Sequence, residues 1–163
     1  TSIGLYLELI KTALQAEDGT RALHEEATNR LISLLSAAPA VIAPRAFSWL
    51  SWLVDLALVR AAAHDETQLR VCRIISLVSS CSPPEAVSKL LAPLVEMLPS
   101  STSGCVGTIE QRRVIGAALT IGFVSDAQRE TGKGKNAALR LAQLLRHEQP
   151  AVAAAACTAL GAM

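Results

Sequence analysis

The chain has 163 residues, of which 51% are apolar and only 3% are aromatic, and its formal net charge is +1. A charge so close to zero gives no bulk electrostatic reason to expect binding to nucleic acid or to an acidic membrane surface. Alanine and leucine carry the apolar excess and are the best helix formers, whereas the aromatic residues that favour strands are scarce. The composition therefore predicts an all-α protein.

The four cysteines bear on the cellular compartment. Cys72, Cys81, Cys105 and Cys157 lie far apart, mostly inside apolar patterns. This spacing favours buried, reduced thiols in a cytosolic protein over disulfides or a metal site.

The chain also lacks an obvious membrane segment by sequence. Its longest apolar stretch, 46–59, is interrupted by Asp55 and falls short of the ~20 residues that cross a bilayer, so we expect no membrane insertion. Because the chain starts at Thr1 rather than methionine and stops at Met163, where a further helix should cover the last one, we expect a fragment of a longer protein.

Proline, glycine and polar clusters divide the chain into apolar segments with helical periodicity. Eight helices are predicted, over residues 3–17, 20–37, 41–62, 66–80, 84–98, 108–127, 135–146 and 150–163. The second helix of each pair starts near residue 20, 66, 108 or 150, which gives steps of 46, 42 and 42 residues. HEAT and armadillo repeats, which pair helices in this way, recur every ~40–47 residues.

This spacing predicts a HEAT/armadillo-like solenoid, a single stack of about four helix pairs that occupies residues 1–163. The approximate pairs are 3–37, 41–80, 84–127 and 135–163. The alternative all-α architecture is a single closed bundle, which fits the number of helices but does not require a constant spacing.

The end of the chain carries the clearest repeat pattern. An apolar helix up to Leu145 is followed by a short polar turn that ends at Pro150, and an alanine-rich helix then closes on Leu160 and Gly161. A unit of two such helices cannot bury its apolar face alone, so it implies neighbouring units of the same kind.

Individual helices show which faces should be buried and where helices start. The fifth helix carries one apolar stripe, and the fourth is apolar over more than half of its circumference, as expected of a helix covered on two sides. The residues of the two faces are Val87, Leu90, Leu91, Leu94, Val95 and Leu98, and Leu69, Val71, Cys72, Ile74, Ile75, Leu77 and Val78. Asp65 and Thr108 are expected N-caps, whereas Pro84 and Pro150 suit a first helical turn.

Small residues predict close contacts between helices. Gly116 and Gly122 in the sixth helix, with Ala153 to Ala156 in the eighth, allow the helix axes to approach closely. Each glycine costs a helix interior ~1 kcal/mol relative to alanine, so packing should compensate for it.

Known catalytic, cofactor and metal motifs fail on inspection, and we expect neither an enzyme nor a cofactor. The run from His24 to Thr28 begins like a zinc-protease helix, but Thr28 replaces the second histidine of H-E-x-x-H, so no metal site is expected there. The glycine–lysine pairs at 132–135 lack both the earlier glycine and the following serine or threonine of a phosphate-binding loop. No small-molecule substrate is expected.

One cluster of basic residues is a candidate partner site. Arg129, Lys133 and Lys135 surround a glycine turn in a C-terminal part, 110–163, that carries a net charge of +3. They could contact an acidic protein surface; the alternative is an ordinary solvated rim. The aromatic residues that single-strand binders use are missing there, so no nucleic acid is expected.

A family resemblance rests on three segments, residues 5–10, 109–111 with 116–124, and 154–161. They resemble the amino-terminal half of the proteasome adapter and scaffold family, large HEAT-repeat proteins associated with the 26S proteasome. Residues 154–161, Ala-Ala-Ala-Cys-Thr-Ala-Leu-Gly, are similar to the family's Ala-Ala-Cys-Thr-Ala-Leu-Gly helix. Ile109-Glu110-Gln111, followed by 116–124, resembles its Ile-Gln helix that ends in a Leu-Gly-Phe segment, and residues 5–10 resemble the opening of the same region. Residues 20–99 match only in pattern.

The resemblance implies a non-catalytic adapter that binds the proteasome core and regulatory particles and stabilises or regulates their association. It implies a cytoplasmic location, with the nucleus as a second compartment, and it supplies no catalytic or contact residue to carry over. Two alternatives stay open: a HEAT-repeat scaffold of another complex, in transport, trafficking or phosphatase assembly, or a non-catalytic helical lobe of a large enzyme.

Overall fold

The computed structural model describes residues 2–16, 18–60, 65–100, 107–125 and 134–163. Over these residues the protein is all-α, which confirms this part of the predicted fold class. The α-helices are α1 (Ser2–Gln15), α2 (Arg21–Ala37), α3 (Ala46–Asp55), α4 (Asp65–Ser80), α5 (Pro84–Met97), α6 (Thr108–Ser125), α7 (Gly134–Leu144) and α8 (Pro150–Ala162). Three short elements flank α3: the 3-10 turns η1 (Pro39–Val41) and η2 (Ala43–Arg45), and the π-helical turn η3 (Leu56–Arg60).

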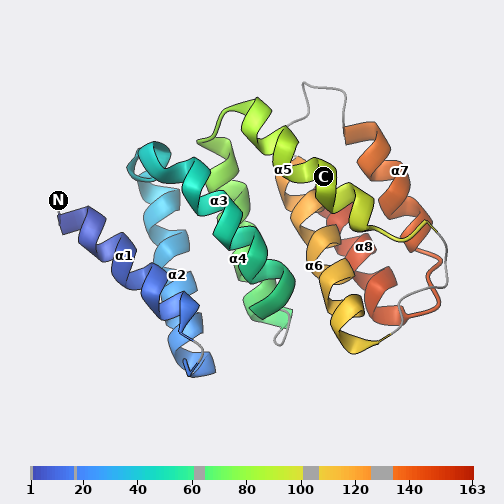
Figure 1. The fold of residues 1–163 in the computed structure, drawn as a ribbon, viewed down its shortest axis with the longest axis horizontal. Coiled ribbons are helices and arrows are strands. Elements are labelled where there is room, and N and C mark those ends of the chain that lie inside the picture. Colours follow the sequence, from blue (N-terminus) through green and yellow to red (C-terminus); the bar gives the residue numbers. More distant parts are fainter. Residues whose placement is uncertain (1, 17, 61–64, 101–106, 126–133) are drawn as a thin grey trace.

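The helices form four consecutive pairs in two layers (Figure 1). Each odd-numbered helix packs against the even-numbered helix that follows it. The even-numbered helices α2, α4, α6 and α8 also pack against one another in sequence and make a continuous layer, which we call the inner layer. The first and last pairs lie at opposite ends of the long axis, so the pairs form an open row (Figure 1).

The prediction of one helix over 41–62 is wrong. The chain instead passes through η1 and η2, then α3, and ends in the wider turn η3. Pro39 and Pro44 explain the start, because proline lacks the amide donor that an α-helix needs beyond its first turn. At the other end, the side-chain Nε2 of Gln68 donates to the carbonyl of Ala57 at 3.1 Å, so this π-turn carbonyl has a buried partner.

Two helices start at the predicted prolines, whereas one of the two predicted N-caps is wrong. Pro84 and Pro150 are the first residues of α5 and α8, as expected. Thr20 caps α2, its hydroxyl accepting from the Leu23 amide at 3.2 Å. Gly107, with a positive φ of 103°, lies at the start of α6 and its carbonyl accepts from the Gln111 amide, so Thr108 is not the cap. Asp65 is the first residue of α4 and its side chain lies outside the described residues.

The core follows the predicted faces. In α4, five of the predicted residues are fully buried (Val71, Cys72, Ile74, Ile75 and Val78), and Leu69 and Leu77 are partly buried. In α5, Val87 and Leu94 are buried, as is the C-cap residue Leu98, and the other three members of the stripe pack against the core. The helix that is covered on most sides therefore lies in the middle of the inner layer, as its composition indicates.

The apolar segment Pro39–Leu58 is longer than the apolar stretch 46–59 that was identified in the sequence. Its 20 residues include an 18-residue window with a mean hydropathy of 1.3, so length and composition alone would let it cross a membrane. In this fold it is interrupted by three turns, and Trp49, Leu50 and Leu53 within it are at most 2% exposed. These side chains belong to the protein core.

Both helix glycines lie at close contacts, as predicted. A Cβ on Gly122 would lie 2.4 Å from the Cα of Ala159, so α6 and α8 touch backbone to backbone. A Cβ on Gly116 would lie 2.7 Å from the carbonyl oxygen of Ala57 in η3. Because real Cβ atoms do not approach other atoms so closely, only glycine fits at these two positions.

Candidate protein-interaction surface

The predicted basic turn is not tested by the structure. Arg129 and Lys133 lie outside the described residues, and Lys135 is the second residue of α7 with its side chain outside them as well. The hypothesis that these three residues meet an acidic partner therefore stays a prediction from sequence.

The segment that resembles a zinc-protease helix is built for packing. Thr28, which replaces the second histidine, is fully buried and its hydroxyl donates within α2 to the carbonyls of His24 and Glu25, both at 2.9 Å. Among the described residues, no group of three or more histidine, cysteine, aspartate or glutamate side chains is placed to hold a metal ion.

A different histidine stabilises the turn between α7 and α8. His147 is 6% exposed, and its Nδ1 accepts a hydrogen bond from the Gln149 amide at 3.1 Å. Because Gln149 is the N-cap residue of α8, the imidazole satisfies one of the amides at the start of that helix. This is a structural role at the turn where the sequence placed only a polar loop.

The cysteines occupy three different environments. Cys72 is fully buried beside Thr120, and burial raises the pKa of its thiol to about 12, with the hydrogen bond to Thr120 as a weaker opposing effect. Cys81 is half-buried and donates to the Pro39 carbonyl, whereas Cys157 is exposed on α8. The prediction that the cysteines are buried is confirmed for Cys72 and wrong for Cys157; Cys105 lies outside the described residues.

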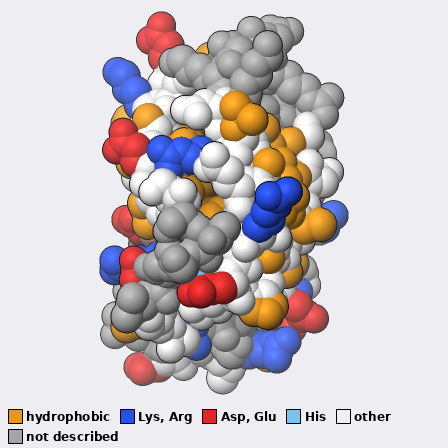
Figure 2. Space-filling view, turned by 90° about the vertical axis from the view of Figure 1, so that its right-hand side faces the viewer, with side chains coloured by type: hydrophobic (Ala, Val, Ile, Leu, Met, Phe, Trp, Pro, Cys, Tyr) orange, Lys and Arg blue, Asp and Glu red, His pale blue; other side chains and the backbone are white. Residues whose placement is uncertain are grey.

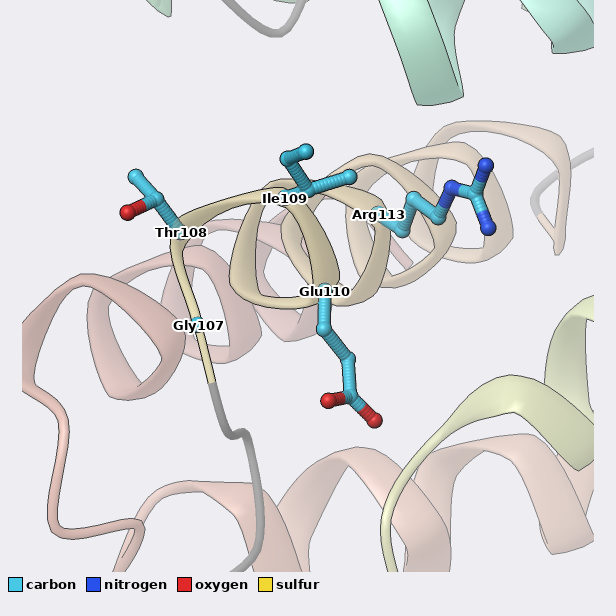
Figure 3. Close-up of a pocket in the computed structure, with 5 residues that line it drawn as sticks. All are labelled: Gly107, Thr108, Ile109, Glu110 and Arg113. Atoms are coloured by element: carbon cyan, nitrogen blue, oxygen red, sulfur yellow. The ribbon is translucent and has the colours of Figure 1, made fainter.

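A shallow hollow lies at the start of α6 (Figure 3). It has a volume of about 550 Å³ and is lined by Gly107, Thr108, Ile109, Glu110 and Arg113. Ile109 and Glu110 point to opposite sides of the helix, and Ile109 is 73% exposed (Figure 3). The lining offers one carboxylate, one guanidinium and one hydroxyl on a single open helix turn, without a histidine or cysteine to act as a base or nucleophile.

The end of the row formed by α7 and α8 is apolar in part. Hydrophobic side chains gather on this face, with charged side chains around them (Figure 2). Leu139 on α7 is 66% exposed and Leu145 just after it is 45% exposed. The outward side of α8 carries small residues instead, namely Ala151, Ala154, Cys157, Thr158 and Gly161.

The solvent side of the inner layer carries the ion pairs between α2 and α4. Arg21 of α2 pairs with Glu66 of α4 at 3.2 Å, and Arg70 of α4 lies 3.7 Å from Glu25 of α2. The first pair is well exposed, so it adds at most ~1 kcal/mol to stability. The pair at Arg70 is incomplete, because its Nε and Nη2 are buried and have no hydrogen-bond partner among the described residues.

Further along the inner layer, α4 and α6 present a mixed apolar and basic surface. Leu69 and Leu77 on α4, with Ile115 and Phe123 on α6, pack on the core and stay partly accessible. Arg73 of α4 and Arg112 of α6 are exposed. We call these six residues the inner seam.

No sequence motif marks the seam. Its two arginines lie at ordinary polar positions of amphipathic helices, so the sequence around each one indicates only that it faces solvent. Their placement on one side of the molecule depends on how α4 and α6 pack, and no sequence spacing reveals it.

Comparison of the chain with protein-family models, with curated proteins and with solved structures gives no significant match.

Proposed function

We propose that the chain is a segment of a HEAT/armadillo-like helical solenoid that works as a non-catalytic scaffold. One observation carries this proposal: the inner helices α2, α4, α6 and α8 pack in sequence and begin at residues 21, 65, 108 and 150. These starts are 44, 43 and 42 residues apart, within the ~40–47 residues of HEAT and armadillo units.

The open row favours a role in binding proteins. In solenoids each repeat contacts only its neighbours, so the two layers leave extended surfaces for partners. Here the accessible surfaces are helix faces of mixed charge, and the hollow at the start of α6 is a shallow one that lies along a single helix. Such surfaces suit recognition of a protein better than conversion of a small molecule.

We further propose that the partner is the 26S proteasome and that the scaffold stabilises or regulates the association of its core and regulatory particles, in the cytoplasm and nucleus. The support is the resemblance of residues 5–10, 109–124 and 154–161 to the proteasome adapter and scaffold family. Two of these segments fall in α6 and α8, the two helices that touch backbone to backbone, so a specific sequence is needed there for packing.

Affinity purification of the endogenously tagged protein, in low salt with ATP, tests the proposal. Co-purified proteins are quantified by mass spectrometry, with an untagged strain and a tagged, unrelated helical-repeat protein as controls. Core and regulatory particles in near-stoichiometric amounts are the expected result.

Two other results would each overturn part of the proposal. Recovery of a different complex without proteasome subunits would refute the family assignment and leave the scaffold role standing. Recovery of a catalytic activity that depends on residues of this segment would refute the non-catalytic role itself.

A further inference from the structure

The two helices of the inner seam are aligned side by side. Gly116 of α6 faces the Gln68 side chain of α4, and one turn further along, the Cys72 thiol lies 3.7 Å from the Thr120 hydroxyl. Both contacts join residues that are 48 positions apart, so α4 and α6 run in parallel with a constant register.

This register places two stripes next to each other on the solvent side. Leu69, Arg73 and Leu77 are spaced by four along α4, and Arg112, Ile115 and Phe123 follow helical spacing along α6. All six are exposed or partly buried, whereas the opposite face of α4 is fully buried. The seam is therefore an apolar strip along two neighbouring helices, with one arginine on each helix.

The charges on this side are unbalanced. The carboxylates of the neighbouring α2–α4 contact, Glu66 and Glu25, already face Arg21 and Arg70. Arg73 and Arg112 form no ion pair within the described part of the chain. The seam thus combines exposed cations with accessible leucine, isoleucine and phenylalanine side chains.

We infer that the inner seam binds an acidic, amphipathic helical segment of a partner protein, an inference that rests on the proposed scaffold role and specifies the chemistry of its partner. Carboxylates of the segment would pair with Arg73 and Arg112, while its apolar side chains pack on Ile115 and Phe123. A helix laid in a groove uses anchors at i, i+3, i+4 and i+7, which matches a strip between two parallel helices. Complementary charge fixes the orientation and speeds association.

A nucleic acid fits the seam less well. Two arginines would neutralise few phosphates, and the nearby Glu25 and Glu66 would repel the backbone. One partly buried phenylalanine does not make the series of stacking platforms that single strands need.

Fluorescence anisotropy with designed peptides tests the inference. The probe is a labelled 18-residue amphipathic peptide with leucine at helical spacing and glutamate elsewhere. Two control peptides are used, one with lysine in place of glutamate and one with the same composition in shuffled order. The protein variants are Arg73→Glu with Arg112→Glu, and the matched control Lys89→Glu with Arg146→Glu, which makes the same charge change at exposed positions away from the seam.

We expect the acidic amphipathic peptide to bind the wild-type protein, and the double change in the seam to weaken binding at least tenfold. The control variant should stay within twofold of wild type, and Arg73→Lys with Arg112→Lys should retain most of the affinity. Circular dichroism and urea unfolding show that every variant is folded.

Absence of binding, or binding that is equal in the seam variant, would overturn the inference. So would equal binding of the lysine or shuffled peptide, or full displacement by a short single-stranded oligonucleotide. These outcomes are separable from the family assignment: proteasome recovery without peptide binding refutes only the seam, and peptide binding without proteasome recovery refutes only the family.

Discussion

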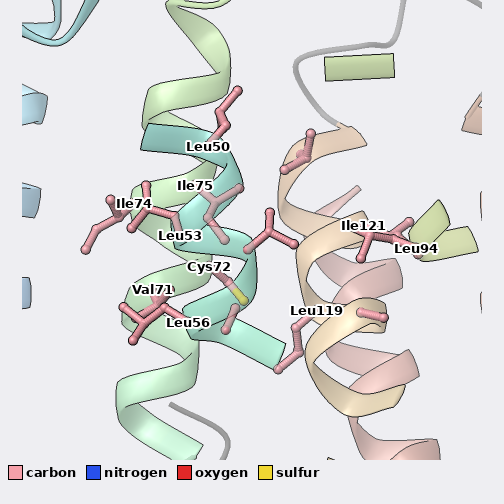
Figure 4. Packing of buried hydrophobic residues seen from close by; sticks show 14 of the residues in the cluster. Leu50, Leu53, Leu56, Val71, Cys72, Ile74, Ile75, Leu94, Leu119 and Ile121 are labelled. Atoms are coloured by element: carbon pink, nitrogen blue, oxygen red, sulfur yellow. The ribbon is translucent and has the colours of Figure 1, made fainter. Parts of the chain in front are cut away.

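Two contacts between helices, that of α3 with α4 and that of α6 with α8, are packed in opposite ways. Where α3 meets α4, large side chains fill the space, including Leu50, Leu53 and Ile75 (Figure 4), and Trp49 of α3 is fully buried as well. Where α6 meets α8, the space is removed instead, since Gly122 brings the two backbones together at Ala159. One contact depends on side-chain volume and the other on its absence.

The comparison indicates opposite sensitivities to mutation. A contact filled by large side chains loses stability when volume is removed, because a cavity remains. A contact between backbones loses stability when volume is added, because helices that touch cannot move apart without disturbing their other neighbours. Removing side-chain volume should therefore destabilise the protein at the α3–α4 contact, and adding volume should destabilise it at the α6–α8 contact.

The largest effect is expected at Trp49. Trp49→Ala removes a side chain that is 1% exposed and packs edge-to-face on Trp52 at a centroid distance of 5.2 Å. We expect a loss of ~3–5 kcal/mol in the free energy of unfolding, measured by urea denaturation. Phe47→Ala, on the same helix but 68% exposed, should change it by less than ~0.5 kcal/mol. Equal losses at both positions would contradict the packing.

The matched test at the close contact uses two glycines. Gly122→Ala should cost ~2–3 kcal/mol, because its Cβ meets the α8 backbone. Gly161→Ala in α8, where a Cβ has nothing within 4 Å, should leave stability unchanged or raise it by up to ~1 kcal/mol through helix propensity. If both substitutions are neutral in urea denaturation, α6 and α8 do not touch as described.

A third effect is expected where α3 ends in η3. Gln68→Met keeps the length of the side chain but removes the donor to the Ala57 carbonyl, which would leave a buried acceptor without a partner. We expect a loss of ~1–2 kcal/mol in thermal or urea unfolding. Gln143→Met on the exposed side of α7 is the control, with no change expected.

The buried thiol gives a pH-dependent effect. Burial raises the pKa of Cys72 from 9.0 to about 12, so folding favours the neutral thiol. Its contribution is complete below pH 9 and is lost as pH rises from 9 towards 12, by up to ~1.4 kcal/mol for each pH unit. The difference in unfolding free energy between wild type and Cys72→Ala should stay constant below pH 9 and narrow as the pH rises from 9 to 10; a difference that stays constant throughout would show that the thiol does not titrate as described.

The smallest effect concerns a helix end. Thr20→Ala removes the hydroxyl that accepts the Leu23 amide and should cost ~1 kcal/mol. Thr12→Ala, in the exposed interior of α1, removes only a hydroxyl that donates back to the Glu8 carbonyl and should be neutral. Similar effects of the two substitutions would argue against a capping role for Thr20.

The sequence predicted those features that depend on local chemistry. Helix starts at Pro84 and Pro150, the buried face of α4 and the tight positions of Gly116 and Gly122 all follow from the residue types themselves. The π-turn η3 at the end of the 41–62 segment was missed, and its Ala57 carbonyl accepts a hydrogen bond from Gln68, a residue of the next helix. A helix pattern in sequence does not record such a partner.

The candidate site was less predictable than the fold. The basic residues Arg129, Lys133 and Lys135 remain a prediction from composition. The inner seam depends on the parallel register of α4 and α6, which the Cys72–Thr120 contact fixes across 48 residues of sequence. Only tertiary packing brings Arg73 and Arg112 to the same side of the molecule.

The most direct test of the open row of helix pairs is a distance between its first and last inner helices. Nitroxide labels on Asn29→Cys in α2 and on the native Cys157 in α8, with Cys81 and Cys105 changed to serine, allow a pulsed electron–electron resonance measurement. Both labelled positions are exposed. Three successive helix-to-helix steps of ~8–10 Å predict a separation of about 25–30 Å. A closed bundle that brings the first and last pairs together predicts about 10–15 Å, and that result would contradict the account.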